Sequence, residues 1–419
     1  MTIVQKILAR SSGKSEVFPG EAILIKPDII VMNDYYVYPF FVDMMNEIGA
    51  VGVSDPEKVV IGIDHMVPAN SIEFADKHRA IRNFARIHGI KNFFDVGRSG
   101  INHHAMAEKG FARPGMVYAD HDAQATTLGA FGCFAASFGL GLIQALVSGE
   151  LWCLVPPSLK IMVEGKFPLG VGNRDLAHHI IRRLGTDGAL YKAVEFTGST
   201  IDSMSIDGRM VLCNMIAHCE AKVGIVNPDA KTVEFVQART REPFSPLVSD
   251  TDAKYEMELR FDVSDLEPLV ATPHEPSQIL PIEKIGNIPV DQVFVGSCAS
   301  GRMEDLKIMA RILHGRRIHP SVRLIIVPPS REVFLEMVKA GFMEAFIESN
   351  AIIESPGCGP CGGAQMGLLG EGEVCVTSSF TNIKGRMGSE AAEIYMASPA
   401  VCAASAVEGR IADPRKYLY

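Results

Sequence analysis

Short apolar runs alternate with more polar, helix-like stretches along the N-terminal third of the chain. Ser71–Ile87 reads as a helix, and the runs that read as buried strands are Glu21–Lys26, Ile29–Met32, Val59–Ile63, Phe93–Val96 and Gly115–Tyr118. Alternating strands and helices are typical of a largely parallel, helix-covered sheet, so we predict an α/β fold. Ligands of such sheets bind outside the carboxyl ends of the strands, and His65, His103 and Asp122 follow these runs.

The middle of the chain has a helix-like stretch at Asn173–Leu184 and a tail, Tyr255–Val263, that alternates as a half-buried strand does. A linker-like segment with several prolines, Ala271–Ser277, follows this tail. We therefore predict three α/β domains, 1–157, 158–280 and 281–419.

The last third alternates again. Its expected helices are Met303–Leu313 and Arg331–Ala340, and its expected strands are Gln292–Val295, Val322–Val327 and Ala351–Ile353. Cys298 follows the first of these strands, and Cys358 and Cys361 follow the last. The carboxyl ends of parallel strands share one edge of a sheet, so the three cysteines can converge there.

The number of thiolates, three, bears on the kind of metal site that they could form. Four protein ligands close a metal site, whereas three leave one metal position open for water or substrate. Thiolates usually hold iron–sulfur clusters, which favours a cluster with one iron lacking a protein ligand. Two other interpretations stay open at this point. Cys358-Gly359-Pro360-Cys361 also has the spacing of a thiol redox pair, and a structural zinc site needs a fourth ligand that is absent within ten residues.

Composition and net charge exclude some classes of binding partner. The 419 residues carry a net charge of -9, which offers no basic field for nucleic acid or an anionic membrane. Nine cysteines without regular close spacing and no secretory signal indicate a reducing, cytoplasmic setting. The uncharged window Leu128–Gly149 is long enough to span a membrane, but it holds five glycines and lacks basic flanks. We expect a buried, close-packed helix there.

A set of motifs follows a familiar collinear order along the chain: IDHMVP at 63–68, SGINHH at 99–104, GAFG at 129–132, VEFTG at 194–198, GRMVLCNM at 208–215, VGSC at 295–298, PGCGPC at 356–361, KGRMG at 384–388 and SPAVCAASAV at 398–407. Together these motifs resemble the aconitase superfamily, in particular the type of large subunit found in 3-isopropylmalate dehydratase or homoaconitase. The resemblance covers essentially the whole chain. It implies a 4Fe-4S cluster held by Cys298, Cys358 and Cys361, and hydro-lyase chemistry on a hydroxy acid.

The resemblance also implies roles for other residues. The open iron would bind the leaving hydroxyl group, an acid would protonate it, and a base would remove a proton from the adjacent carbon. Relatives of this branch carry the swivelling domain, with its serine base, on a separate small subunit, so we expect such a partner. Ser330-Arg331-Glu332 imitates that serine motif by coincidence. The expected catalytic residues are Asp64, His65, His103, Asp122 and His218, Arg386 matches a substrate arginine, and Asn214 and Ser300 lie in the cluster shell.

Several positions depart from the family pattern. Ala123 and Gln124 replace a substrate-binding serine and a histidine, Thr381 replaces a substrate arginine, and His218 replaces a glutamate. An arginine fork to a carboxylate is strong and geometrically specific, so its loss points to a substrate other than isopropylmalate or citrate. His121 could replace the lost imidazole.

Apolar side chains could form a different substrate wall or serve ordinary packing, and the residues concerned are Phe380, Ile383 and Tyr35–Tyr38. The remaining cysteines, which lie in apolar surroundings, are expected to be buried packing residues: Cys133, Cys153, Cys213, Cys219, Cys375 and Cys402. A cluster-binding relative without dehydratase activity and a thiol redox protein remain the alternative functions.

Overall fold

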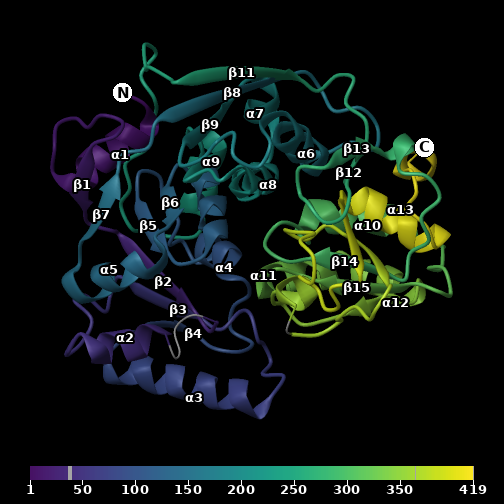
Figure 1. Ribbon diagram of the computed structural model, residues 1–419, viewed down its shortest axis with the longest axis horizontal. Coiled ribbons are helices and arrows are strands. Elements are labelled where there is room, and N and C mark those ends of the chain that lie inside the picture. The colour runs from purple at the N-terminus through teal and green to yellow at the C-terminus, as the bar shows by residue number, and fades with distance from the viewer. Residues whose placement is uncertain (36–39, 364, 419) are drawn as a thin grey trace. The chain divides into compact units, whose positions relative to one another are not determined.

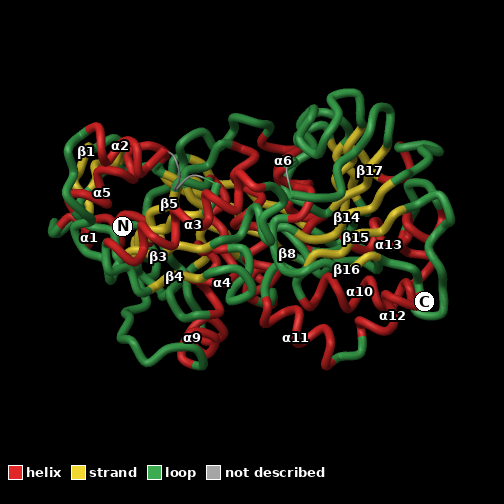
Figure 2. Tube along the Cα trace, turned by 90° about the horizontal axis from the view of Figure 1, so that it is seen from below, coloured by secondary structure: helices red, strands yellow, loops and turns green. Residues whose placement is uncertain are grey.

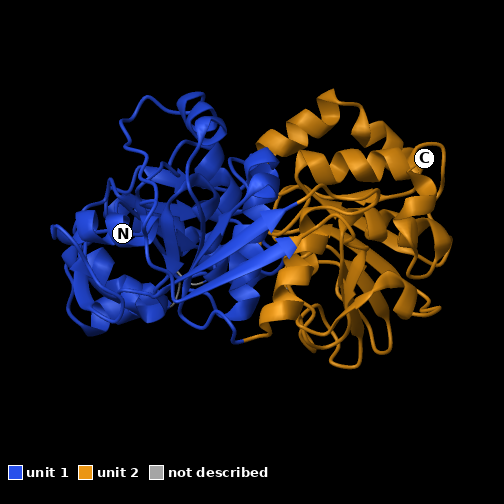
Figure 3. Cartoon of the chain, turned by 90° about the horizontal axis from the view of Figure 1, so that it is seen from above, with its two compact units in different colours: residues 1–64, 68–164, 187–261 blue, residues 65–67, 165–186, 262–419 orange. Residues whose placement is uncertain are grey.

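The chain folds into two compact units, each built from several chain segments (Figure 3). Unit 1 comprises residues 1–64, 68–164 and 187–261, and unit 2 comprises 65–67, 165–186 and 262–419. The structure, a computed structural model, describes residues 1–35, 40–363 and 365–418.

Unit 1 contains a five-stranded parallel sheet with the strand order β4-β3-β2-β5-β6. The strands are β2 (Ile29–Asn33), β3 (Val59–Gly62), β4 (Asn92–Phe94), β5 (Val117–Asp120) and β6 (Phe134–Ser137). Strands β2, β3 and β5 are buried on both faces, as in a helix-covered sheet. The helices near it in sequence are α1 (Ile3–Ser12), α2 (Val42–Glu47), α3 (Ile72–Ile87), α4 (Asn102–Glu108) and α5 (Leu142–Ser148) (Figure 1).

Two smaller sheets complete unit 1. Strands β1 (Ala22–Ile25) and β7 (Leu151–Leu154) form an antiparallel pair. A four-stranded sheet has the order β10-β9-β8-β11, with parallel pairing of β8 (Ser158–Glu164), β9 (Ala193–Thr197) and β10 (Val223–Val226). Strand β11 (Met257–Asp262) lies at its edge, and the adjacent helices are α7 (Ser199–Ser203), α8 (Ile206–Met215) and α9 (Ala230–Gln237).

Unit 2 is organised around a seven-stranded mixed sheet, order β13-β12-β18-β17-β14-β15-β16. Its parallel part consists of β14 (Gln292–Gly296), β15 (Arg323–Val327), β16 (Ile352–Ile353), β17 (Val374–Thr377) and β18 (Glu393–Ala397). Strands β12 (Leu269–Ala271) and β13 (Ile279–Pro281) extend it antiparallel. Its helices, shown in red in Figure 2, are α6 (Asn173–Leu184), α10 (Met303–Leu313), α11 (Arg331–Lys339), α12 (Phe342–Glu348) and α13 (Pro399–Glu408).

The predicted α/β class is confirmed, and most expected elements lie where the hydrophobic pattern puts them. Helices α6 and α10 have the predicted bounds, and Ser330 caps the N-terminus of α11 by accepting a hydrogen bond from Val333 N at 3.1 Å. The fold thus places Ser330 on a strand-to-helix turn. The three-domain division stays a prediction, since the two compact units are a different partition of the chain.

The single helix expected within Leu128–Gly149 is wrong. This window contains the end of the 3-10 helix η2 (Ala123–Phe131), strand β6, a short 3-10 turn and α5. Gly132 ends η2 in the left-handed region with φ 71°, which breaks any continuous helix. Among the described residues, no helix is both long and apolar enough to cross a membrane.

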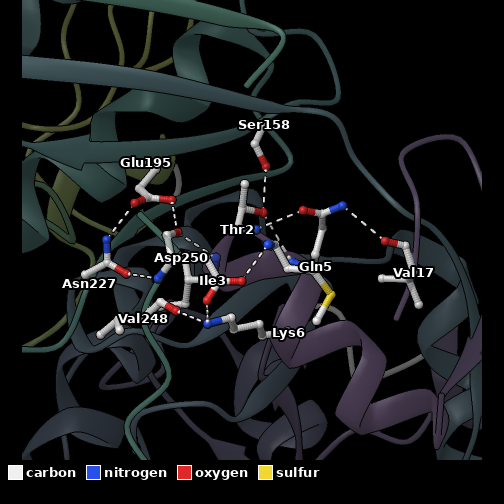
Figure 4. A network of polar contacts seen from close by, with 12 residues as sticks. Thr2, Ile3, Gln5, Lys6, Val17, Ser158, Glu195, Asn227, Val248 and Asp250 are labelled. Carbon is white, nitrogen blue, oxygen red and sulfur yellow. Dashed lines mark hydrogen bonds and ion pairs between the residues drawn. The ribbon is translucent and has the colours of Figure 1, made fainter. Parts of the chain in front are cut away.

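A network of polar contacts fastens α1 to the four-stranded sheet (Figure 4). The buried carboxylate of Glu195 on β9 accepts hydrogen bonds from Asn227 Nδ2 at 2.6 Å and from Ser249 Oγ at 2.7 Å. Ser249 Oγ in turn accepts from the backbone N–H of Ile3 at 2.7 Å. Each group of this network has a partner, which is the condition under which a buried carboxylate is tolerated.

Candidate active site

In unit 1, Asp64 ties the end of β3 to the start of α4. Its Oδ2 accepts a hydrogen bond from Asn102 N at 2.9 Å, and its own N–H donates to Asp34 Oδ1 at 3.0 Å. Gly62 allows this approach, because a Cβ there would lie 1.8 Å from Asn102 Oδ1. Asp34, which the sequence reasoning missed, is fully buried and lies 3.2 Å from His78 Nε2. Asp64 is therefore held on both sides.

Helix α4 carries His103, whose buried imidazole lies between two carboxylates. His103 Nε2 is 3.6 Å from Asp122 Oδ2, and Nδ1 is 3.9 Å from Asp120 Oδ2. Burial lowers the pKa of His103, but Asp122, Asp120 and Asp64 together raise it above the usual value. The structure thus brings the predicted residues His103 and Asp122 together and adds Asp120, which was not predicted. Its place at the end of a strand, two residues before Asp122, was the available signal.

Asp122 begins η2, the segment on which the family pattern is altered. Its Oδ1 accepts from Gln124 N at 2.9 Å, so Gln124 is positioned by the helix cap, whereas Ala123 is exposed. The fully buried Asn214 at the end of α8 donates from Nδ2 to Thr127 Oγ1 at 2.9 Å. Asn214 therefore contacts the segment that Asp122 begins.

The two histidines proposed as replacements are both in unit 1. His218 is half-buried in the short 3-10 helix η4 (Ile216–Cys219). His121 is half-buried next to Asp122, and its ring meets Phe41 edge to face with centroids 5.6 Å apart. Burial lowers the pKa of His121 despite the nearby charge of Asp122, which favours a neutral imidazole.

In unit 2, Cys298 follows β14 on a turn that needs unusual backbone angles. Gly296 has φ 154° and Ser297, a non-glycine residue, has φ 73°. A Cβ on Gly296 would lie 2.4 Å from the carbonyl oxygen of Val327, so no side chain fits there. A strained turn that the surroundings hold in place is common at functional sites. Cys298 is buried, and its Sγ is 3.7 Å from Ser297 Oγ.

Cys358 precedes the 3-10 turn η6 (Gly359–Gly362), which follows β16, and Cys361 lies within that turn. Cys298 and this pair thus end two parallel strands of one sheet, as predicted. The hydrogen bond from Cys358 lowers the pKa of Cys361, burial opposes this, and the charge of Arg386 and the Ser297 hydroxyl lower it further. Ser297 therefore contacts both Cys298 and Cys361, and the site favours a thiolate.

The six other cysteines are buried, as their apolar surroundings indicate. Burial raises the pKa of Cys153 to about 11 and of Cys133 and Cys219 to about 12, and it also raises those of Cys213, Cys375 and Cys402. These thiols stay protonated at neutral pH, in contrast to Cys361.

Arg386 and Thr381 lie on the loop that connects β17 to β18. Arg386 is exposed and donates from Nε to the carbonyl oxygen of Cys361 at 3.0 Å, which fixes its guanidinium beside the cysteine turn. Thr381 is 3% exposed, and its Oγ1 accepts from Ile383 N at 3.4 Å. Of the suggested apolar wall, Phe380 packs on a core cluster, Ile383 and Tyr35 are exposed, and residues 36–38 lie outside the described residues.

Two buried arginines near these loops were not predicted. Arg302 is 1% exposed and donates from Nη2 to the carbonyl oxygen of Cys298 at 2.9 Å. The predicted shell residue Ser300 donates to Asp305 Oδ2 at 3.0 Å, the same oxygen that caps α10 by accepting from Arg302 N. Arg174 on α6 reaches the loop after β17.

His65 is half-buried, and its neighbour Val67 accepts a hydrogen bond from Gln365 Nε2, which links this segment to the cysteine loop.

Comparison with known proteins identifies the relatives of this chain. The profile described as the Aconitase family (aconitate hydratase) matches residues 5–409. The 3-isopropylmalate dehydratase large subunit 1 of Methanopyrus kandleri is 43% identical over 418 residues, covering 100% of this chain and 99% of that protein. The probable methanogen homoaconitase large subunit of Methanothermobacter thermautotrophicus is 43% identical, covering 99% and 98%.

A solved structure, Thermococcus kodakaraensis aconitase X in its holo-form, has a TM-score of 0.50 at 15% identity and covers 91% of this chain and 89% of that one. At that identity it supports the fold alone. The α/β architecture and the family match define an aconitase-like hydro-lyase. The chain belongs to the aconitase family.

Proposed function

We propose that the chain is the large subunit of a 4Fe-4S hydro-lyase that acts on a hydroxy acid other than isopropylmalate or citrate. The observation that carries this proposal is the altered residue set around the family site, with the three cysteines retained. The relatives are named 3-isopropylmalate dehydratase or homoaconitase, so the substrate class is the part that needs a test.

The cysteine site fits a cluster by its donor set. Cys298, Cys358 and Cys361 would hold it, because the first two lie on turns at one edge of the sheet and the pKa of the third is lowered toward the thiolate that metals require. When bound, such a cluster supplies a Lewis-acidic iron for the departing hydroxyl group.

The side chains of this chain then move protons and hold the substrate. His103 and Asp122, which face each other, together form the acid that supplies a proton to the departing hydroxyl oxygen. Asp64 and His65 are adjacent in sequence and take part in the transfer of the same proton. Asn214 and His218 are supporting residues of this proton-transfer group. Arg386, anchored at Cys361, binds a substrate carboxylate through its guanidinium. The base is supplied by a small subunit, as the "large subunit" names of the relatives suggest.

Thr381 is the altered position that bears most directly on the substrate. A buried threonine cannot offer the two parallel N–H donors of an arginine, and the loss of such a contact costs about 2–5 kcal/mol of binding. Ala123 offers no hydroxyl group where relatives have a serine. A substrate with fewer or differently placed carboxylates is therefore the better match.

The test is anaerobic purification of the chain with its small subunit, reconstitution with iron and sulfide, and assay against a panel of hydroxy acids. We expect 4Fe-4S absorbance and turnover of a member other than isopropylmalate or citrate. Preferred turnover of isopropylmalate would reject the substrate proposal. A cluster without turnover of any panel member would favour the non-catalytic relative, and no iron together with a reversible disulfide would favour the redox protein.

A further inference from the structure

Asp120 is a carboxylate for which the family match gives no role. It is the last residue of β5 and is 1% exposed. Its Oδ1 accepts two backbone hydrogen bonds, from His121 N at 2.7 Å and from Asp122 N at 3.1 Å. This half of the carboxylate shapes the turn that carries Asp122, and its other oxygen faces His103.

The second oxygen of Asp120 and one nitrogen of His103 face each other. Asp120 Oδ2 and His103 Nδ1 are 3.9 Å apart, and within the described part of the chain neither atom has a hydrogen-bond partner although both are buried. Two unsatisfied buried polar groups are costly, and a proton held between them relieves both at once. The opposite ring nitrogen, Nε2, lies 3.6 Å from Asp122 Oδ2.

While both flanking carboxylates are ionised, the imidazole between them can satisfy both only as a cation. The neutral ring has one N–H and one lone pair, so one of the two flanking carboxylates would face a lone pair. The protonated ring has two N–H groups and can serve both. We propose that Asp120 is a positioning residue that keeps His103 protonated on both nitrogens and aims one N–H at Asp122.

The charges around His103 agree with this proposal. Asp64, after β3, adds a third carboxylate to those of Asp120 and Asp122, and η2, which packs on α4, contains no titratable residue. Burial raises the pKa of Asp120, the charge of the His103 cation opposes that rise, and the net pKa is about 7. The buried carboxylates and the buried imidazolium stabilise one another, because an unpaired charge of either sign is costly in the interior.

This inference concerns the protonation state of His103, and only its catalytic use rests on the proposed function. The test is therefore a nitrogen NMR titration of the full chain with labelled histidine, in which the His103 signals are assigned by their loss in H103Q. In the unsubstituted protein we expect both ring nitrogens protonated at pH 7. A single neutral tautomer at that pH would overturn the proposal without any variant, and it would leave the hydro-lyase proposal standing.

The decisive variant is D120N. Its Oδ1 keeps the two backbone hydrogen bonds, and its amide donates toward Nδ1, so the ring is forced toward the neutral form with the proton on Nε2. We expect the midpoint of the His103 titration to fall by about one pH unit or more. A structural role confined to the turn predicts no shift, and that result would contradict the proposal.

Asp28 offers a matched control, because its Oδ2 accepts from Val117 N at the opposite end of the same strand. D28N removes a carboxylate from β5's surroundings at a place remote from His103, and we expect the titration of His103 to stay unchanged. A shift of equal size in D28N would mean that any charge loss near β5 moves His103, which also contradicts a specific role of Asp120. Circular dichroism of each variant checks that the fold is retained.

Discussion

Arg174 on α6 donates a hydrogen bond from Nη1 to the carbonyl oxygen of Ser378 at 2.9 Å, and its Nη2 donates to the next carbonyl, that of Ser379. Its Nε donates to His178 Nε2 at 3.1 Å, so all three guanidinium nitrogens are used. Burial lowers the pKa of Arg174 to about 10, which still leaves it charged at neutral pH. One buried cation thus holds the start of the loop that carries Thr381.

We expect R174M to destabilise unit 2. The change leaves two buried carbonyl oxygens without donors, each worth about 1–3 kcal/mol, so the free energy of unfolding should fall by roughly 2–6 kcal/mol. Urea unfolding followed by circular dichroism measures this. The control is R183M, at an exposed position on the same helix, for which a change within about 0.5 kcal/mol is expected. Equal losses in both variants would show that the loop contact does not matter.

Cys298 separates the cluster from the redox interpretation. In the reconstituted protein, C298A should lose most of the bound iron, and activity should fall by more than about 100-fold, since even outer-shell partners of a metal contribute 10–100-fold. C402A, at a buried cysteine on α13, should keep both. Iron analysis and absorbance give the readout. Indifference to C298A, with a reversible disulfide between Cys358 and Cys361, would be the signature of a thiol redox protein.

Gly129 is a position at which a larger residue should lower the stability of the fold. A Cβ at this residue would lie 1.7 Å from the carbonyl oxygen of Gly224 on β10, and backbone cannot move aside cheaply. We expect G129A to lower stability by more than about 2 kcal/mol. G141A is the matched control, because a Cβ there meets nothing within 4 Å. Thermal unfolding compares the two, and a G129A protein as stable as G141A would contradict the close packing of η2 on β10.

Asp229 predicts a pH-dependent contribution to stability. Burial raises its pKa, but hydrogen bonds from Arg209 and Thr232 outweigh this and lower it from 3.8 to about 2. A carboxyl group with a depressed folded-state pKa stabilises above the unfolded value and loses that effect as the pH falls through the folded value. Asp229 is partly exposed, so roughly 1–2 kcal/mol is expected at pH 7 after allowing for solvent screening.

The measurement is the difference in unfolding free energy between the unsubstituted protein and D229N. It should be constant above about pH 5 and shrink between about pH 4 and 2. D252N, at an exposed carboxylate, should show no such dependence. A difference that persists undiminished at pH 2 would assign the effect to shape at the helix cap rather than to charge.

The hydrophobic pattern predicted α6, α10, α11, β14 and β15 of unit 2 well because each is long or sharply bounded. Helix α10 has a buried stripe of Leu306, Met309, Ala310 and Leu313, and β14 is a continuous apolar run before Gly296. The placement of the cysteines followed from strand order alone, because parallel strands end at one edge. Local sequence and simple topology were sufficient for these features.

Other features depend on contacts between residues far apart in sequence. Leu128–Gly149 is apolar because it is buried on several sides, and periodicity cannot distinguish that from one helix. Asp120 and Arg174 appear as ordinary polar residues until their partners, His103 and Ser378, are known to be near. The partners of these buried charged side chains could therefore be identified only from the structure.

The chain passes between the two units several times, since residues 165–186 belong to unit 2 and residues 187–261 return to unit 1. During synthesis α6 leaves the ribosome more than a hundred residues before β14, the strand that begins the cysteine edge of its own sheet. Until the strands of unit 2 have been synthesised, the apolar face of α6 has no partner within its own unit. No single cut yields both units as continuous fragments, so a split version of this protein would need the α6 segment supplied in trans.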